Sequence, residues 1–182
     1  MTIKLATDLG EIELFFDVQN APITANYFEE LVAEGSLDLT SFFRIVSQDS
    51  QSSQQGSPIE VLQCGVWKES QEELTKLEHE STNLTGLRHR KWSLSTARYG
   101  VGTAYGSFFI CMRDEPQLDF GGSRHPDGFG FAVFGKVVSG FSVLETIYRN
   151  REPEEFQQQA VVIKRATVNT CLLYTSPSPR DS

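Results

Sequence analysis

Two runs of apolar and aromatic residues, 107–112 (SFFICM) and 131–138 (FAVFGKVV), decide the fold class. Both are rich in Phe, Ile and Val, which favour β-strands, and both have the length of a strand. The residues between them, 119–130, are rich in Gly, Asp and Pro, a composition that predicts an irregular connection. The sequence therefore predicts two strands joined by a loop.

Further strands are expected on both sides of this pair. Residues 3–7 and 11–16 alternate apolar and polar side chains around a turn at Asp8-Leu9-Gly10, which predicts a β-hairpin. The other β-rich runs are 41–46, 61–65, 92–98 and 160–168.

Two segments have helical spacing. Thr24 can cap a helix that ends at Gly35, and either Ser139 or Ser142 opens a second helix that runs through Tyr148. Residues 69–76 read as a solvated acidic stretch or one helical turn. Seven or eight strands, mostly adjacent in sequence, together with two helices predict a mainly β fold. We expect an antiparallel barrel or sandwich with helices over its open ends.

Length and charge limit the functions that the chain can have. Its 182 residues, 39% of them hydrophobic, fit one soluble domain with a hydrophobic core. A formal net charge of -8 opposes binding to nucleic acid and to anionic membranes. No membrane span or signal peptide is evident. We expect a cytoplasmic protein, or a periplasmic one if a signal peptide precedes this sequence.

The C-terminal residues 171–182 have no helical or strand period and differ in composition from the rest. They resemble the translated read-through of a sequencing adapter. We therefore expect one domain over residues 1–170 and a disordered, artefactual tail over 171–182. Two cysteines remain, Cys64 and Cys111; both lie in apolar runs, which is typical of core residues.

Two features stand out as candidates for a functional site. Arg44 lies inside the aromatic run 42–46, where an arginine either points to solvent or is held to donate hydrogen bonds. Paired aromatics at 108–109 either fill a core or form the wall of a pocket. The three histidines are far apart and without metal-ligand spacing, which indicates surface or hydrogen-bonding roles and no metal site.

The order of several motifs resembles that of the cyclophilin-type peptidyl-prolyl isomerases, in the divergent form found in bacteria. Seven collinear blocks carry the resemblance between residue 2 and about residue 168: 22–28 (PITANYF), 43–46 (FRIV), 62–65 (LQCG), 94–98 (LSTAR), 106–110 (GSFFI), 118–119 (LD) and 131–140 (FAVFGKVVSG).

The resemblance implies a closed, eight-stranded antiparallel barrel capped by two α-helices, and catalysis of cis/trans interconversion at X-Pro bonds without a cofactor or metal. By position, Arg44 matches the catalytic arginine, Gln63 the substrate-positioning glutamine and Phe109 the floor of the proline pocket. The implied substrate-binding residues are Val61, Ala97, Arg98, Ser107, Leu118 and Phe131.

These residue types suit the reaction. Rotation about a peptide bond has a barrier of roughly 18–20 kcal/mol because it breaks amide resonance. Catalysis therefore needs a site that binds the twisted amide better than either planar form. An apolar pocket can grip the prolyl ring, while Arg44 donates to the prolyl nitrogen or the neighbouring carbonyl.

The sequence departs from the family pattern in the pocket. Glu60 stands where the family usually has an aromatic residue, so we expect a missing wall that Phe120 or Phe131 could fill. Ser107 replaces a backbone-contacting glutamine, and Gln117 replaces the tryptophan of some members. The implied partners are proline-containing polypeptides and cyclosporin-like ligands, the latter weakened by these substitutions, and we expect a monomer.

Two other hypotheses remain open. One is a weakly active or inactive module that keeps the groove and binds Pro-containing segments of a partner protein. The other is a generic small-ligand barrel, which predicts a closed apolar lumen. The position of Arg44 relative to the lumen distinguishes this last hypothesis from the others.

Overall fold

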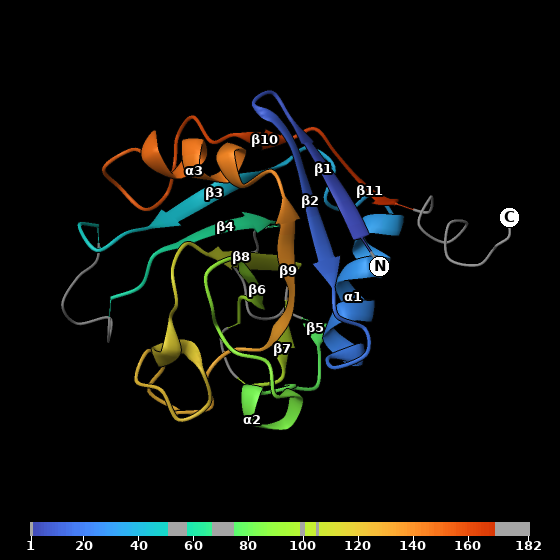
Figure 1. Ribbon diagram of the computed structural model, residues 1–182, viewed down its shortest axis with the longest axis vertical. Helices are drawn as coiled ribbons and strands as arrows, with labels where there is room; N and C mark the ends of the chain where they lie inside the picture. The colour runs from blue at the N-terminus through green and yellow to red at the C-terminus, as the bar shows by residue number, and fades with distance from the viewer. Residues whose placement is uncertain (1, 51–57, 67–74, 99–100, 105, 170–182) are drawn as a thin grey trace, which may run out of the picture.

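β-Strands dominate the chain in a computed structural model (Figure 1). The structure describes residues 2–50, 58–66, 75–98, 101–104 and 106–169. The predicted tail, most of the Ser/Gln-rich loop before Pro58 and most of the acidic stretch 69–76 lie outside the described residues.

The strands follow the predicted runs closely. They are β1 (Thr2–Thr7), β2 (Gly10–Phe16), β3 (Thr40–Val46), β4 (Val61–Gly65), β5 (Thr75–Lys76), β6 (Ser93–Thr96), β7 (Thr103–Ala104), β8 (Ser107–Cys111), β9 (Val133–Ser139), β10 (Val162–Ile163) and β11 (Arg165–Asn169). The helices are α1 (Pro22–Ala33), α2 (Thr82–Thr85) and α3 (Phe141–Arg149), with a 3₁₀ turn η2 (Pro116–Leu118). The short β5–β7 pair and α2 are not predicted by the sequence patterns.

The main sheet closes on itself through the last segment of the chain. Its strand order is β10-β3-β4-β8-β6-β9-β2-β1-β11, and its pairs are antiparallel. The two outermost strands, β10 and β11, are separated in sequence only by Lys164, whose backbone N–H donates to Ala6. Counted as one interrupted strand, they make the eighth strand of a mainly β barrel, which confirms the predicted fold class.

The barrel interior is filled by side chains. Apolar residues from its strands and from α1 and α3 form one buried cluster. At its centre Phe28 of α1 stacks on Phe134 of β9, with ring centroids 4.5 Å apart, and Phe108 meets both rings edge-on. The small-ligand-barrel hypothesis is therefore wrong, because the lumen is a packed core.

The two longer helices lie on opposite sides of the barrel (Figure 1). Helix α1 begins at Pro22, where a fixed φ and a missing N–H suit the first turn. The predicted cap at Thr24 is wrong, because Thr24 lies inside the helix and its N–H and hydroxyl both donate to Glu80. Glu80 also accepts from the Ile23 N–H, so a carboxylate from a distant segment caps this helix.

Helix α3 likewise begins without a serine cap. Its N-cap residue is Gly140, which adopts the left-handed conformation at φ 86°. A Cβ at this position would lie 2.5 Å from the Glu11 carbonyl oxygen. Neither Ser139 nor Ser142 caps it through a side chain. In the described part of the chain, no helix has the length and apolar character of a membrane span.

Phe134→Ala tests the aromatic centre of the core. Because the ring is fully buried and contacts three other rings, we expect a loss of about 3–5 kcal/mol in the free energy of unfolding, measured by denaturant titration. Phe120→Ala, at a ring that is 44% exposed, is the matched control and should cost under about 1 kcal/mol. Equal losses for the two variants would contradict this assignment of the core.

Candidate active site on the outer face of the barrel

A second apolar cluster lies on the outside of the barrel. Along β4 and β8, Leu62 and Phe108 point into the core, whereas Val61 and Phe109 point outward. The outward residues form a separate buried group with the partly buried Phe131 packed against it: Val46, Ile59, Val61, Phe109, Cys111 and Leu118. This group forms the apolar wall of a surface pocket.

The pocket has a volume of about 180 Å³ and combines this wall with polar side chains. Eight of the nine site residues named from the sequence line it: Arg44, Val61, Gln63, Ala97, Arg98, Phe109, Leu118 and Phe131. Val46, Ile59 and Arg124 complete its described lining. It lies outside the packed lumen, as an external groove requires.

The register of four neighbouring strands aligns the polar and aromatic parts of the site. Arg44 on β3 pairs with Gln63 on β4, Gln63 with Phe109 on β8, and Phe109 with Ser95 on β6. Directly opposite residues in adjacent strands share one face and lie close together. The strand pairing therefore places Arg44 and Gln63 next to the Phe109 ring.

Arg44 is held by two acceptors. Its Nη1 donates to Gln63 Oε1 at 3.3 Å, and its Nε and Nη2 both donate to Glu155 Oε1, at 3.0 and 2.7 Å. The Arg44 side chain is 27% exposed and that of Glu155 12%, so the ion pair is partly shielded from water. The guanidinium therefore has a defined orientation at the edge of the pocket.

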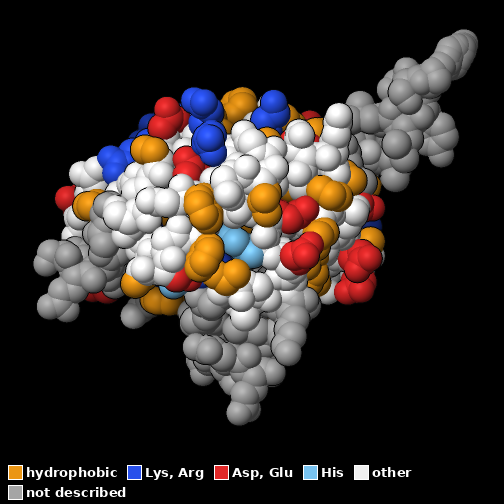
Figure 2. All heavy atoms as spheres, turned by 90° about the horizontal axis from the view of Figure 1, so that it is seen from below, with side chains coloured by type: hydrophobic (Ala, Val, Ile, Leu, Met, Phe, Trp, Pro, Cys, Tyr) orange, Lys and Arg blue, Asp and Glu red, His pale blue; other side chains and the backbone are white. Residues whose placement is uncertain are grey.

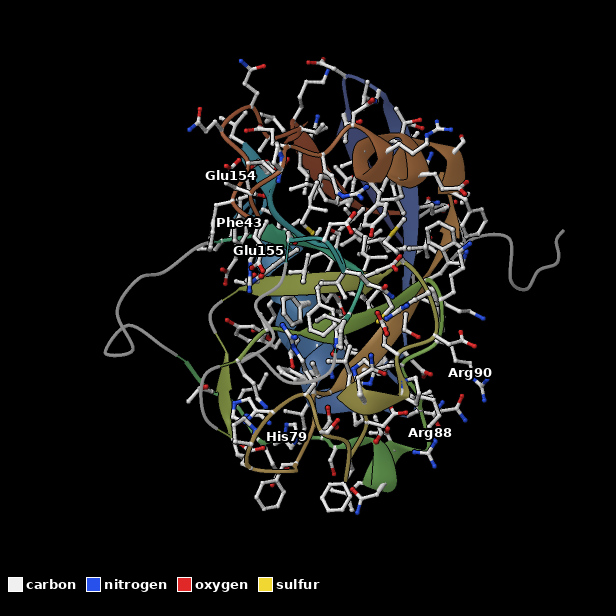
Figure 3. All side chains as sticks on the ribbon, turned by 90° about the vertical axis from the view of Figure 1, so that its left-hand side faces the viewer. Phe43, His79, Arg88, Arg90, Glu154 and Glu155 are labelled. Atoms are coloured by element: carbon white, nitrogen blue, oxygen red, sulfur yellow. The ribbon has the colours of Figure 1, made fainter. Side chains whose placement is uncertain are left out.

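The Glu155 carboxylate reaches Arg44 because its segment pairs with the outer edge of β3. The Ile45 N–H donates to the Glu155 carbonyl oxygen at 2.8 Å, and the Gln157 N–H donates to that of Phe43 at 2.9 Å. Figure 3 shows Phe43, Glu154 and Glu155 gathered on the same side of the molecule. Phe156, which lies between Glu155 and Gln157 in sequence, stacks on Phe43 and lies against the Arg44 guanidinium.

Ser107 does not line the pocket, which corrects its predicted contact with substrate. Its side chain is fully buried and lies behind Gln63, whose Nε2 donates to Ser107 Oγ at 2.8 Å. The Ser107 hydroxyl in turn donates to the Cys64 carbonyl at 3.3 Å. Ser107 is thus a positioning residue: it fixes the Gln63 amide, which leaves Oε1 toward Arg44.

A buried histidine supports the aromatic floor. The His89 ring lies nearly parallel to Phe109, with centroids 6.1 Å apart, and Phe131 meets Phe109 edge-on at 5.8 Å. His89 Nδ1 lies 2.7 Å from Asp119 Oδ1 and its Nε2 lies 2.8 Å from Ser95 Oγ. Burial lowers the pKa of His89, although the Asp119 carboxylate opposes this shift.

The order Ser95, His89, Asp119 has the connectivity of a hydrolytic triad. Ser95 is nevertheless fully buried and is absent from the described lining of the pocket, so no substrate can reach its hydroxyl. Ser95 and Asp119 instead fix the ring of His89 beneath Phe109. Their role in this site is structural.

Arg98 anchors the loop that forms the opposite rim. Its side chain is 1% exposed, and Nη1 and Nη2 donate to the two carboxylate oxygens of Asp127, each at 3.0 Å. Its Nε donates to the Gly130 carbonyl at 2.8 Å, and its guanidinium lies over the Phe131 ring. Hydrogen bonding from Arg98 lowers the pKa of Asp127 to about 2.

The departures from the family pattern do not leave the expected gap. Glu60 points to a different hollow, where its carboxylate lies 3.4 Å from Arg113, and the preceding residue Ile59 lines the pocket instead. Of the two residues expected to fill the missing wall, Phe131 lines the pocket and Phe120 does not. Gln117 donates from Nε2 to the Pro58 carbonyl at 2.7 Å, which ties the segment before Ile59 to η2.

The two cysteines and the three histidines have the environments that the sequence indicates. Cys64 and Cys111 are free and fully buried, and burial raises the pKa of each thiol. All three histidines have polar contacts, with His79 near the Phe129 carbonyl and His125 near Asp127. In the described ranges, no cluster of three or more His, Cys, Asp or Glu side chains is arranged to hold a metal ion.

Sequence patterns miss several residues that complete the site: Val46, Ile59, His89, Arg124 and Glu155. Glu155 belongs to an acidic, glutamine-rich segment with no periodic signal, and it meets Arg44 across 111 residues of chain. Arg124 comes from the loop between β8 and β9, where burial and the charge of Arg44 lower its pKa.

The family comparison agrees with this geometry. A family model described as cyclophilin-type peptidyl-prolyl cis-trans isomerase matches residues 2–168. The isomerase cyp18 of Streptomyces antibioticus is 30% identical over 176 residues, which cover 92% of this chain and 98% of the relative. Peptidyl-prolyl cis-trans isomerase A of Dickeya dadantii is 32% identical, over 80% of this chain and 70% of the relative.

The fold has a solved counterpart. A cyclophilin-type isomerase of Cryptosporidium parvum, crystallised in the presence of the dipeptide Ala-Pro, superimposes with a TM-score of 0.71. The match covers 93% of this chain and 99% of that one at 20% sequence identity.

The Arg98–Asp127 ion pair predicts a dependence of stability on pH. The folded pKa of Asp127, about 2, lies below its ordinary value of 3.8, so the pair stabilises the fold above about pH 4. We expect Asp127→Asn to lower the melting temperature at pH 6, and the difference from wild type to vanish as the pH falls toward 2. Thermal melts over this range measure it.

The matched control is Asp49→Asn, at a carboxylate whose side chain is 93% exposed. Its melting temperature should follow that of the wild type at every pH. A deficit for Asp127→Asn that is as large near pH 2 as at pH 6 would show that the carboxylate charge is not what stabilises this loop.

Proposed function

The chain belongs to the cyclophilin-type peptidyl-prolyl cis-trans isomerases, and we propose that its outer pocket grips the prolyl ring while Arg44 stabilises the twisted X-Pro amide. Its substrates are proline-containing polypeptides. The observation that carries this mechanism is the fixed orientation of Arg44 at the edge of an apolar pocket of about 180 Å³.

The pocket supplies the grip. Phe109 forms its floor, with Val61, Leu118 and Phe131 around it, and these apolar side chains suit a pyrrolidine ring. Holding the proline side of the bond lets the residue before proline rotate against a fixed frame. The pocket excludes water from the ring, which strengthens hydrogen bonds made at its edge.

Arg44 supplies the preference for the transition state. Loss of amide resonance localises a lone pair on the prolyl nitrogen, which becomes an acceptor that the planar amide does not present. A guanidinium donor already oriented toward this position stabilises the twisted form more than either planar form. Gln63, held by Ser107, keeps the Nη1 side of the guanidinium in place.

No nucleophile or proton transfer enters this mechanism. No covalent bond is made or broken in the rotation, so the residues only bind, orient and desolvate the amide. The buried Ser95 and His89 contribute through the position of Phe109.

A non-catalytic binding module is the second candidate. The observation that favours it is Glu155, which takes two of the donor contacts of Arg44 and partly neutralises its charge. In such a module the groove binds Pro-containing segments while Arg44 stays paired to Glu155 during binding. The two candidates differ in what removal of Arg44 or Glu155 does to the isomerisation rate.

Three finer expectations belong to this proposal and stay predictions: a monomeric state, a cytoplasmic location and weakened binding of cyclosporin-like ligands. The last has support in Gln117, which stands where some family members carry tryptophan and which bonds to Pro58 and Glu115.

Arg44→Ala tests the mechanism directly. A preorganised charged donor contributes ~2–4 kcal/mol to the transition state, so kcat/KM should fall ~30- to 1000-fold in a protease-coupled assay of a proline peptide. Arg149→Ala, at an exposed arginine of α3, is the matched control and should retain the wild-type rate. An unchanged rate in Arg44→Ala, or a wild-type rate no higher than the uncatalysed one, would contradict the proposal.

Glu155→Gln separates the two candidates. If Glu155 orients Arg44 for catalysis, loss of the charged contact should lower kcat/KM about tenfold, or ~1.4 kcal/mol. Glu154→Gln, at the exposed neighbouring residue, should leave the rate unchanged. A rate that rises in Glu155→Gln would instead mean that the ion pair restrains Arg44, as the binding module requires.

A further inference from the structure

A second hollow, of about 360 Å³, lies outside the catalytic pocket and is lined by cations. It lies where residues 86–91 pass over the β6–β9–β2 part of the sheet. Four of the chain's sixteen lysines and arginines line it: Arg88, Arg90, Lys91 and Lys136. We refer to it as the basic groove.

None of these four cations is neutralised by a direct ion pair with a described residue, although the chain carries a net charge of -8. Asp17 is the only carboxylate in the described lining, and its two oxygens accept from the backbone N–H and the Nδ2 of Asn20 at 3.0 and 2.9 Å. The groove therefore keeps a local positive charge in an acidic molecule.

Aromatic and backbone contacts hold the cations in place. Lys91 lies over the Trp92 ring and Lys136 over the Phe15 ring, with the ammonium groups 5.1 and 6.0 Å from the centroids. Arg88 Nη1 donates to the Thr82 carbonyl at 3.5 Å. These contacts order the side chains without neutralising them.

The charges of the molecule are segregated in space. Arg88 and Arg90 project outward on the side of the barrel opposite Glu154 and Glu155 (Figure 3). On the face seen from below, several acidic side chains gather on one side, and lysines and arginines lie mainly toward the upper edge together with a few acidic side chains (Figure 2). A ligand can thus meet positive charge at the groove although the net charge of the chain is negative.

We propose that the basic groove binds an acidic segment of a client polypeptide, in which Asp or Glu side chains meet the four cations. Phe15, Leu87 and Val133 add apolar surface for the aliphatic parts of such a segment. Long polyanions and anionic membranes fit less well, because the net negative charge repels any ligand that extends far beyond the groove.

The groove and the proline pocket are neighbours along two segments of the chain, at β6 and β9. Val133 lines the groove and Phe131 lines the pocket. These two residues are two positions apart in sequence, or roughly 7 Å in extended chain. On β6, Ser93 lines the groove, and Ala97, just beyond the strand, lines the pocket. One client chain can therefore occupy both, so the inference rests on the proposed function for its biological meaning.

Binding is tested with two labelled peptides in a fluorescence anisotropy titration. One carries a proline and a nearby run of four glutamates; the other has glutamines in their place. We expect the acidic peptide to bind the wild-type protein at least about tenfold more tightly, with a difference that shrinks as salt rises. The double variant Arg90→Glu/Lys136→Glu should lose this preference.

Arg165→Glu is the matched control, because Arg165 is an exposed arginine of β11 outside the groove. It should keep the preference of the wild type for the acidic peptide. Equal binding of both peptides to the wild-type protein, or an equal loss in Arg165→Glu and the double variant, overturns the proposal. Tighter binding of single-stranded DNA or of anionic vesicles than of the acidic peptide also overturns it.

The isomerase rate on a short, uncharged proline peptide is measured in parallel. If the wild-type protein isomerises this peptide but shows no preference for glutamates, only the proposal about the basic groove is overturned. If the wild-type protein prefers glutamates but does not accelerate isomerisation, the proposal about the basic groove stands and the proposed catalysis is overturned.

Discussion

Strand register in the β3–β4–β8–β6 part of the sheet fixes both the core and the site. On β4 and β8 alternate side chains enter the packed lumen, and those between them face the pocket. A slip of one residue would exchange the two sets, placing Gln63 in the lumen and Leu62 in water. Because the aromatic core tolerates no such exchange, core packing also holds Arg44, Gln63 and Phe109 in one row.

Around this row the site is held by polar partners from distant segments. Glu155 orients Arg44, Ser107 orients Gln63, and His89 lies flat against Phe109. Each of these three residues is at least partly shielded from water, so water competes only weakly for its hydrogen bonds. In the proposed mechanism the donors must be in place before the amide twists, and these contacts provide that preorganisation without any group that reacts.

Sequence patterns predict the strands of the barrel, and the family resemblance implies most of the pocket. Runs such as 61–65 and 107–112 are recognised by their composition, since both faces of these strands are buried, and the order of motifs assigns Arg44, Gln63 and Phe109. Partners that arrive from far along the chain leave no local pattern. Glu80 caps α1 and Glu155 binds Arg44 across 111 residues, while Ile59 replaces the expected wall because Glu60 turns to Arg113.

The placement of the cations likewise depends on the fold as well as on the local sequence. The net charge of -8 predicts that long polyanions are repelled, but it averages over a surface whose cations are unevenly placed. Three of the groove cations lie within residues 88–91, and the fourth, Lys136, joins them only because β6 pairs with β9. The sheet that positions the proline pocket thus also creates a positive site beside it. In an acidic isomerase, such a site favours clients whose own negative charge would otherwise keep them away.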